Sequence, residues 1–298
     1  MKRIALFALL ALLVLNAALL TGALADGDTV TYEGRVTVPK DTEYVDLGKT
    51  RVSDFETFYK FLDQLPNLKK VDMFETYMWP SRCHTMTQKY PNIEFGWTIK
   101  FADHEVRTDA TAFTTLHWRE SEPHEGIIGE AVQYCTKLKY LDIGHNWVTD
   151  ISFVEKLPDL RVLIIASNNV SDISPIASLH KLEWLEIFTN KITDISALAG
   201  LDHLQHLNIG NNQIADLSPL YGLKNLKRLW MWRATGRKVT PQEELDKLME
   251  AIPGLEIHAV DDPTLGGWRR TDHYQVIKQI NETGQYIPFS DSWPDEDE

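Results

Sequence analysis

The chain has 298 residues, of which 43% are hydrophobic, and its 43 acidic against 30 basic side chains give a formal charge of −13. The apolar fraction is ordinary for a folded protein, and the length suffices for one large domain or two small ones. The acidic balance argues against nucleic acid as a partner, because binding to a phosphate backbone needs a basic surface. With only two cysteines, the chain must be stabilised by a packed core rather than by disulfide bonds.

Residues 1–25 are typical of a signal peptide. A positively charged start precedes an apolar run from Ile4 to Leu20, and Ala23-Leu24-Ala25 offers the small residues that signal peptidase cleaves. We therefore expect a mature chain that begins at Asp26 and is secreted, or is associated with the cell surface. The alternative is a retained anchor helix, since about 17 apolar residues approach the minimum for a membrane span. After signal cleavage we expect no membrane span.

Residues 26–137 show partial matches to a repeat that becomes regular further along the chain. Val45-x-Leu47, Leu68-x-x-Val71-x-Met73 and Phe113-x-x-Leu116-x-Trp118 each fit part of it. We expect irregular, partly helical repeats that cap the N-terminal end, because an open end of a repeat stack exposes core residues. Cys83 and Cys135 could pair, but a separation of about two strands lies near the 7 Å limit for a disulfide and favours free thiols.

Residues 138–258 contain a regular repeat of 22 residues. Leucines stand at positions 138, 160, 182, 204 and 226, and each opens the pattern L-x-x-L-x-(I/M). A period near 22 with this pattern is the signature of a leucine-rich repeat solenoid. The alternation predicts short strands stacked into a parallel sheet on the concave face, with 3₁₀ turns or short helices on the convex side. The predicted fold class is an α/β solenoid with irregular caps at both ends.

Two polar columns accompany the leucines. The first follows each strand, where a buried side-chain amide can satisfy backbone groups of the neighbouring turn. The second comes four residues later, where an aspartate caps a turn more often than it forms part of a calcium ladder. The columns are Asn146, Asn168, Asn190 and Asn212, and Asp150, Asp172, Asp194 and Asp216.

Beyond the last full repeat, the sequence predicts one more helix and strand. Thr240-Pro241-Gln242-Glu243 has the form of a capping box and predicts a helix that ends near Ala251. Leu255-x-Ile257 supplies a last strand. We expect residues 259–290 to fold over the C-terminal end of the stack as a cap, and residues 291–298 to form an acidic, solvated tail.

The 22-residue unit, with its asparagine and its following Asp-Ile turn, resembles the internalin-type leucine-rich repeats of bacterial surface and secreted proteins. This resemblance covers residues 138 to about 233. The whole chain is also similar to a group of secreted leucine-rich repeat proteins of Clostridia, through Leu65-Pro66-Asn67-Leu68-Lys69-Lys70-Val71-Asp72 and Gly266-Gly267-Trp268-Arg269. The resemblance implies a bacterial binding protein, often an adhesin. The lack of a C-terminal sorting motif argues against attachment to the cell wall.

The side chains that flank the inward leucines should face solvent on the concave sheet. Five of them are large aromatics, and exposed, clustered aromatics usually mark a binding surface. Phe188, Gly210 and Trp232 are equivalent in successive units and would form a slot about 10 Å wide, unless Gly210 merely relieves crowding. The alternative for the whole face is that a terminal cap folds back and covers it. The predicted ligand-binding residues are Tyr140, Trp184, Glu186, Phe188, His206, Asn208, Gly210, Arg228, Trp230, Trp232 and Arg233.

The sequence contains no recognised catalytic motif and implies no cofactor. His203 with His206, and His117 with His145, lack a complete set of metal ligands, so we predict no metal site. We predict a non-enzymatic recognition module that binds a protein ligand through the concave face, with a glycan-binding module as one alternative. A carbohydrate-active enzyme is another, because Asp142 and Glu186 would lie about 10 Å apart, near the separation of the carboxylates in inverting glycosidases.

Overall fold

The structure is a computed structural model that describes residues 28–101, 104–115, 127–231, 241–259 and 267–294. The chain divides into two compact units: Met1–Thr76 with Met86–Gly96, and Tyr77–Thr85 with Trp97–Glu298. The predicted boundary at residue 137 therefore falls inside the second unit. The predicted signal peptide, residues 1–25, lies outside the described residues. Within the described ranges, no helix is long and apolar enough to cross a membrane.

The first unit combines a hairpin, a short parallel strand pair and a helix. Strands β1 (Thr29–Tyr32) and β2 (Val36–Pro39) are antiparallel, and β3 (Tyr44–Asp46) pairs in parallel with the start of β4 (Lys70–Met78). Helix α2 (Phe55–Leu62) begins where the Asp54 side chain accepts a hydrogen bond from the backbone N–H of Glu56 at 3.0 Å. Its apolar face packs on β1, because the Phe58 and Phe61 rings both lie 5.4 Å from that of Tyr32.

The chain passes between the units within β4, α3 (Pro80–Lys89) and β5 (Glu94–Phe101). In the second unit, the end of β5 pairs with β6 (His104–Arg107) as an antiparallel hairpin. Cys83 and Cys135 are buried and do not form a disulfide bond, as favoured from the sequence. Burial raises the pKa of the Cys83 thiol to about 12, so both cysteines serve as small core residues rather than as reactive thiols.

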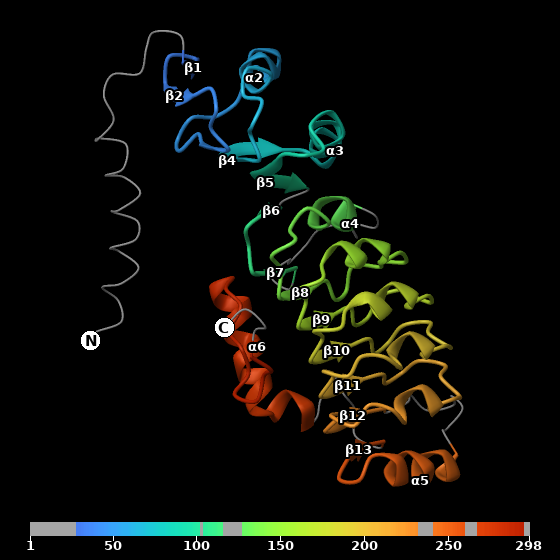
Figure 1. The fold of residues 1–298 in the computed structure, drawn as a ribbon. Coiled ribbons are helices and arrows are strands. Elements are labelled where there is room, and N and C mark those ends of the chain that lie inside the picture. Colours follow the sequence, from blue (N-terminus) through green and yellow to red (C-terminus); the bar gives the residue numbers. More distant parts are fainter. Residues whose placement is uncertain (1–27, 102–103, 116–126, 232–240, 260–266, 295–298) are drawn as a thin grey trace, which may run out of the picture. The chain divides into compact units, whose positions relative to one another are not determined.

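A seven-stranded parallel sheet runs through the second unit in the order of the chain (Figure 1). Each strand contributes three residues, and the register aligns equivalent positions, so that Leu185 lies opposite Leu163 and Leu207. This arrangement confirms the predicted leucine-rich solenoid. It begins one strand earlier than expected, within the region predicted as an irregular cap. The strands are β7 (Ala112–Thr114), β8 (Tyr140–Asp142), β9 (Val162–Ile164), β10 (Trp184–Glu186), β11 (His206–Asn208), β12 (Arg228–Trp230) and β13 (Glu256–His258).

Short 3₁₀ helices form the convex side, as the 22-residue unit predicted. In all four, the carboxylate of the repeated aspartate accepts a hydrogen bond at 2.8 Å from the backbone N–H of the serine that opens the helix. The aspartate column therefore caps turns, as predicted. Of the predicted capping box, Thr240 lies outside the described residues. The convex elements are α4 (Ile127–Val132), η1 (Ser152–Lys156), η2 (Ser174–Ser178), η3 (Ser196–Leu198), η4 (Ser218–Leu220) and α5 (Gln242–Ala251).

The asparagine column joins each repeat to the one before it. The Asn168 amide donates hydrogen bonds at 3.0 Å to the carbonyls of Ile143 and Ile165, one in each of two repeats. Its oxygen accepts bonds from the backbone N–H groups of Asn146 and Val148. Asn190 and Asn212 repeat the two carbonyl contacts one and two units further along. The predicted role of this column is confirmed.

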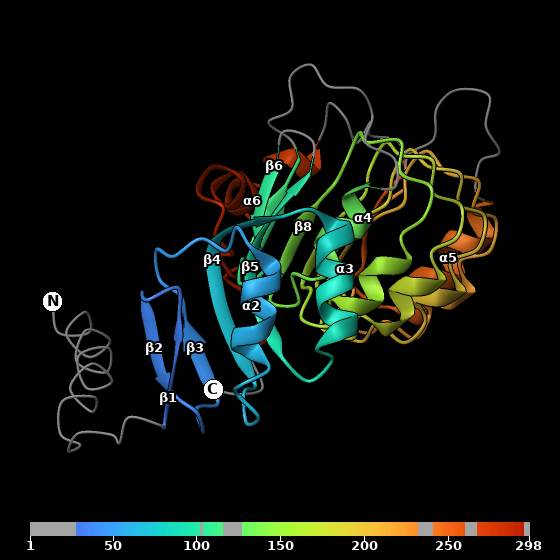
Figure 2. The ribbon, with the colours of Figure 1, turned by 90° about the horizontal axis from the view of Figure 1, so that it is seen from above.

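The described residues 267–290 of the predicted C-terminal cap lie along the sheet rather than over the end of the stack. Helix η5 (Gly267–Arg270) leads into α6 (Asp272–Thr283), which lies along the concave side of the sheet (Figure 1). Seen from above, the strands lie between α6 on one side and the convex helices on the other (Figure 2). Gly284, with φ of 66°, ends α6 in the left-handed region. Asp291–Pro294 then pack against the repeats, so the predicted solvated tail is wrong there, and residues 295–298 lie outside the described residues.

Candidate functional site

The concave face is covered by α6, so the expectation that its aromatics face solvent is wrong. Tyr140, Trp184, Phe188 and Trp230 are each at most 3% exposed. They form one apolar cluster with Ile277 and Ile280 of α6 and with Phe289, which follows the helix. The physical reason is that removing so much aromatic surface from water stabilises a folded-back C-terminus more than solvation does. A role of these residues in ligand binding stays a prediction.

Most polar residues of the predicted site are buried as well. Glu186 accepts a hydrogen bond at 2.6 Å from the Trp184 indole, and Asn208 is held at 3.2 Å by the backbone N–H of Gly210. His206 is 1% exposed, and burial lowers its pKa to about 3. Arg228 is the exception, because it is partly exposed and pairs with Glu256 at 3.0 Å.

Two predicted site residues, Trp232 and Arg233, lie outside the described residues. The proposed slot can therefore be judged only from Phe188 and Gly210. Phe188 is buried in the cluster beneath α6, and Gly210 is buried next to it in the following repeat, where its carbonyl accepts the Thr189 N–H at 2.8 Å. Because both residues are buried, they do not line an open slot.

Asp142 and Glu186, the two carboxyls of the enzyme alternative, share a small cavity. The space measures about 40 Å³ and is also lined by Arg269, Tyr274 and Ile277 from the C-terminal region. A cavity of this size holds a few waters, whereas ligand pockets measure about 300–1,000 Å³. Burial raises the pKa of Asp142 to about 7 and that of Glu186 well above its usual value. These carboxyls have no access to a sugar in this conformation.

A polar column that the sequence analysis overlooked runs along one edge of the concave sheet. Each member stands directly before a strand and repeats every 22 residues. Alternation along the chain puts these positions on the same side as the inward leucines, so they were not among the residues predicted to face solvent. In the structure they hold the segment that follows α6. The column consists of Lys139, Arg161, Glu183, Gln205 and Lys227.

The centre of this column is a buried ion pair. Arg161 and Glu183 lie on neighbouring repeats and are almost fully buried. The Ser292 hydroxyl and the Trp293 N–H both donate to the Glu183 carboxylate, at 2.6 and 3.1 Å. In return, Arg161 donates to the carbonyl of Trp293 at 2.7 Å. A buried charge needs such a complete set of partners, so the repeats and the C-terminal segment fix each other.

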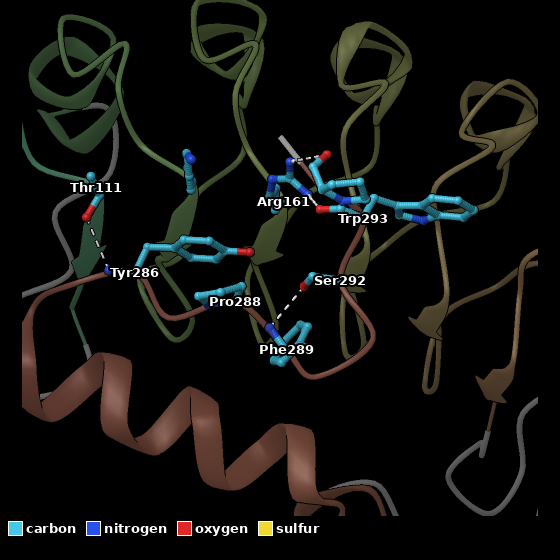
Figure 3. Close-up of a pocket in the computed structure, with 9 residues that line it drawn as sticks. Thr111, Arg161, Tyr286, Pro288, Phe289, Ser292 and Trp293 are labelled. Carbon is cyan, nitrogen blue, oxygen red and sulfur yellow. Dashed lines mark hydrogen bonds between the residues drawn. The ribbon is translucent and has the colours of Figure 1, made fainter. Parts of the chain in front are cut away.

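An open pocket of about 480 Å³ lies between this column and the C-terminal segment. Figure 3 shows Arg161 and Thr111, which directly precedes β7, on the side of the repeats. Tyr286 and Trp293 of the C-terminal segment face them. The Lys139 ammonium lies 5.9 Å from the Tyr286 ring. The pocket therefore combines apolar rings with positive charge. Its full lining is Thr111, Lys139, Arg161, Tyr286, Pro288, Phe289, Ser292, Trp293 and Pro294.

Comparisons with known proteins agree with the repeat architecture. Two family models match, "Leucine Rich repeats (2 copies)" at residues 136–178 and 202–247, and "Leucine rich repeat" at residues 158–214. Residues 136–247 are leucine-rich repeats. A comparison with the curated proteins finds no match.

Solved structures of bacterial leucine-rich repeat proteins are similar to the chain. An internalin (inlF) of Listeria monocytogenes matches with 24% identity and a TM-score of 0.44, covering 76% of this chain and 72% of its own. Internalin C2 of the same organism matches with 27% identity and a TM-score of 0.36, covering 45% and 69%. A leucine-rich repeat protein of Leptospira interrogans matches with 24% identity and a TM-score of 0.44, covering 66% and 50%.

Proposed function

We propose that the chain is an exported, non-catalytic recognition module that binds a protein partner at the pocket between the edge column and its own C-terminal segment. The observation that carries the proposal is the 480 Å³ pocket itself, which is open and in the size range of ligand sites. Leucine-rich repeats are typical of protein-interaction domains, and this pocket is an accessible hollow beside the concave strands.

The chemistry of the pocket favours an acidic or aromatic side chain of the partner. Tyr286, Phe289 and Trp293 supply ring faces, and prolines 288 and 294 add rigid apolar surface. Arg161 is paired with Glu183, and Lys139 adds a second basic side chain to the pocket. Aromatic anchors flanked by a cation are the kind of group that carries most of the energy at protein interfaces.

The absence of catalysis is part of the proposal. The two carboxyls that could have served glycoside hydrolysis lie at a cavity of about 40 Å³ under α6, and burial raises the pKa of both. Stacked aromatics for a glycan are buried in the same cluster. A protein partner at the edge pocket needs none of these groups.

The test is a comparison of two pocket variants with a matched control. The mature chain is used to capture partners from surface extracts of neighbouring cells, and the captured protein is then titrated. Lys139→Glu and Tyr286→Ala should each weaken binding about tenfold or more, the effect of losing an interface anchor. Lys137→Glu makes the same charge change at an exposed position outside the pocket and should bind like the parent. Equal affinity of all variants would move the site elsewhere, and chemical change of the captured partner would contradict a non-catalytic role.

Export has its own test. N-terminal sequencing of material recovered outside the cell should give Asp26 as the first residue, since cleavage follows Ala25. A sequence that starts at Met1 would show that the N-terminal segment is retained.

A further inference from the structure

Three potential metal ligands meet where α6 crosses the sheet. Among the described residues, His206, His273 and Asp291 bring one ligand atom each within 4.8 Å of one another. His206 belongs to β11, His273 to the first turn of α6, and Asp291 to the segment after α6. The sequence analysis compared His206 with His203, but the His203 ring instead stacks on Trp293 at 5.0 Å. The true neighbour is distant in the sequence.

His206 carries an unexplained feature. Both of its ring nitrogens are buried and have no hydrogen-bond partner. Leaving a buried polar nitrogen without a partner destabilises the folded state, and proteins usually avoid it. Its ring lies 4.3 Å from that of His273 and 4.9 Å from that of Trp184. His206 therefore lies beside a second imidazole and a carboxylate without bonding to either. Contacts within the protein do not explain this group of metal-type ligands.

We propose that His206, His273 and Asp291 bind a divalent transition-metal ion of the zinc class. Two imidazole nitrogens and one carboxylate oxygen match the three protein ligands of open zinc sites, with water in the fourth position. Zinc bonds of about 2.0–2.2 Å separate tetrahedral ligands by roughly 3.4 Å. The His273 Nε2 to Asp291 Oδ1 hydrogen bond of 2.6 Å would open slightly, and His206 would close on them, through side-chain shifts of about 1 Å.

The surroundings supply the supporting contacts that metal ligands require. Lys227 donates to Asp291 Oδ2 at 2.6 Å, which fixes the carboxylate while its other oxygen faces His273. The indoles of Trp184 and Trp230 give His206 an apolar shell. Lys227 and Arg228 are the nearby cations, and Arg228 is offset by Glu256. Ligands oriented by outer hydrogen bonds and shielded by apolar groups are typical of metal sites.

Metal binding here would clip the C-terminal region onto the repeats. The three ligands come from the sheet, the helix and the following segment, so one ion would link all three. This effect goes beyond partner recognition, because it acts on α6, which covers the concave face, and on the segment after it, which forms one wall of the pocket. We expect bound zinc to slow amide hydrogen exchange in residues 272–294.

The experiment uses the untagged mature chain after removal of metal with a chelator. Calorimetric titration with Zn²⁺ should show one ion per chain, and Co²⁺ should give the visible absorption of a four- or five-coordinate site with nitrogen ligands. His273→Gln and Asp291→Asn should each weaken Zn²⁺ binding at least about tenfold, the lower end of what even outer-shell changes cost. His180→Gln, at an exposed position on the convex side, should bind Zn²⁺ like the parent.

Three outcomes would overturn the site. These are no Zn²⁺ binding to the parent, undiminished binding in both His273→Gln and Asp291→Asn, or hydrogen exchange in residues 272–294 that Zn²⁺ leaves unchanged. His273 and Asp291 are only partly buried, so their variants should fold even if a change at the buried His206 does not. Because Zn²⁺ alone is the probe, failure of the metal site would not affect the test of partner binding at Lys139 and Tyr286.

Discussion

At the scale of single residues, four successive repeats share a position where the backbone is left-handed. His145, Ser167, Thr189 and Asn211 have φ between 55° and 63°, and each directly precedes an asparagine of the buried column. Residues other than glycine, asparagine and aspartate avoid this region. The hydrogen bonds of the asparagine amide hold the turn in place and offset the cost. The leucine pattern does not reveal this column, because four different residue types occupy it.

Thr189 is the least suited of the four, because a β-branched side chain is strained at positive φ. Thr189→Asn introduces asparagine, the residue that occupies the equivalent position 211 in the next repeat. The variant should be more stable than the parent by about 0.5–1 kcal/mol. Urea unfolding measures the change. Thr193→Asn makes the same substitution in the same repeat outside the left-handed region and should give no gain. A gain in both variants would point to a cause other than backbone strain.

The inward leucines are the second residue-scale feature. Leu185 is fully buried and lies between Leu163 and Leu207 of the neighbouring strands. Leu185→Ala should cost about 2–5 kcal/mol, since the cavity is bounded by repeats on both sides and cannot collapse. The midpoint of denaturation reports the loss. An unchanged midpoint would contradict the assignment of this side chain to the core.

At the scale of elements, α6 changes the chemistry of the strands that it covers. Its apolar side chains remove Asp142 and Glu186 from water without giving either a cationic partner in contact. The groups around the pair are Tyr140, Tyr274, His145 and Arg269. Because burial is the main cause of the raised pKa values, docking of α6 and protonation of these carboxyls are linked.

This linkage predicts a pH dependence with a definite sign. The pKa of Asp142 is about 7 in the folded state, against 3.8 for an unperturbed aspartate. Folding therefore takes up a proton at Asp142 between these values, so the contribution of this carboxyl to stability is greatest below about pH 4 and is lost as the pH rises to 7. One carboxyl gives a slope of up to about 1.4 kcal/mol per pH unit.

Urea unfolding between pH 5 and 8 tests this prediction through Asp142→Asn. The variant keeps an oxygen that can accept the Gly144 N–H, which lies 3.0 Å from the aspartate, but it cannot ionise. Its stability should fall less steeply with pH than that of the parent. Asp202→Asn, at an exposed position, should leave the slope unchanged. A parent whose stability rises from pH 5 to 7, with no difference in Asp142→Asn, would exclude the linkage.

At the scale of the whole molecule, the sequence predicted the contacts between neighbouring repeats but not the packing of α6 across several repeats. The 22-residue period gave the sheet, the convex turns and the role of Asn168, because all of these are contacts between neighbouring units. Docking of α6 depends on pairs such as Tyr140 and Asn281, which share a 2.7 Å hydrogen bond across 141 positions. A signal was present, since Val162 and Ile164 are apolar at positions assigned to solvent. Such side chains indicate a covered face.

The cover itself therefore decides the behaviour of the molecule. The Ile277 and Ile280 side chains are buried against the aromatic cluster, and burying each contributes about 1.5–3 kcal/mol. Without them, the indoles of Trp184 and Trp230 would form part of an exposed apolar face of the kind that drives association.

Replacing both isoleucines, Ile277→Asp with Ile280→Asp, should release α6 while the solenoid stays folded, because the repeats are held by their own leucine and asparagine columns. We expect the double variant to bind the dye ANS more strongly than the parent and to associate as its concentration rises, as measured by light scattering after size exclusion. The matched control, Gln275→Asp with Gln279→Asp, adds the same charges to the exposed side of the helix. It should match the parent in ANS binding and in association. If the isoleucine variant neither binds ANS nor associates, α6 does not shield the aromatic face in solution, and the eleven residues predicted from the sequence become candidates for the partner site again.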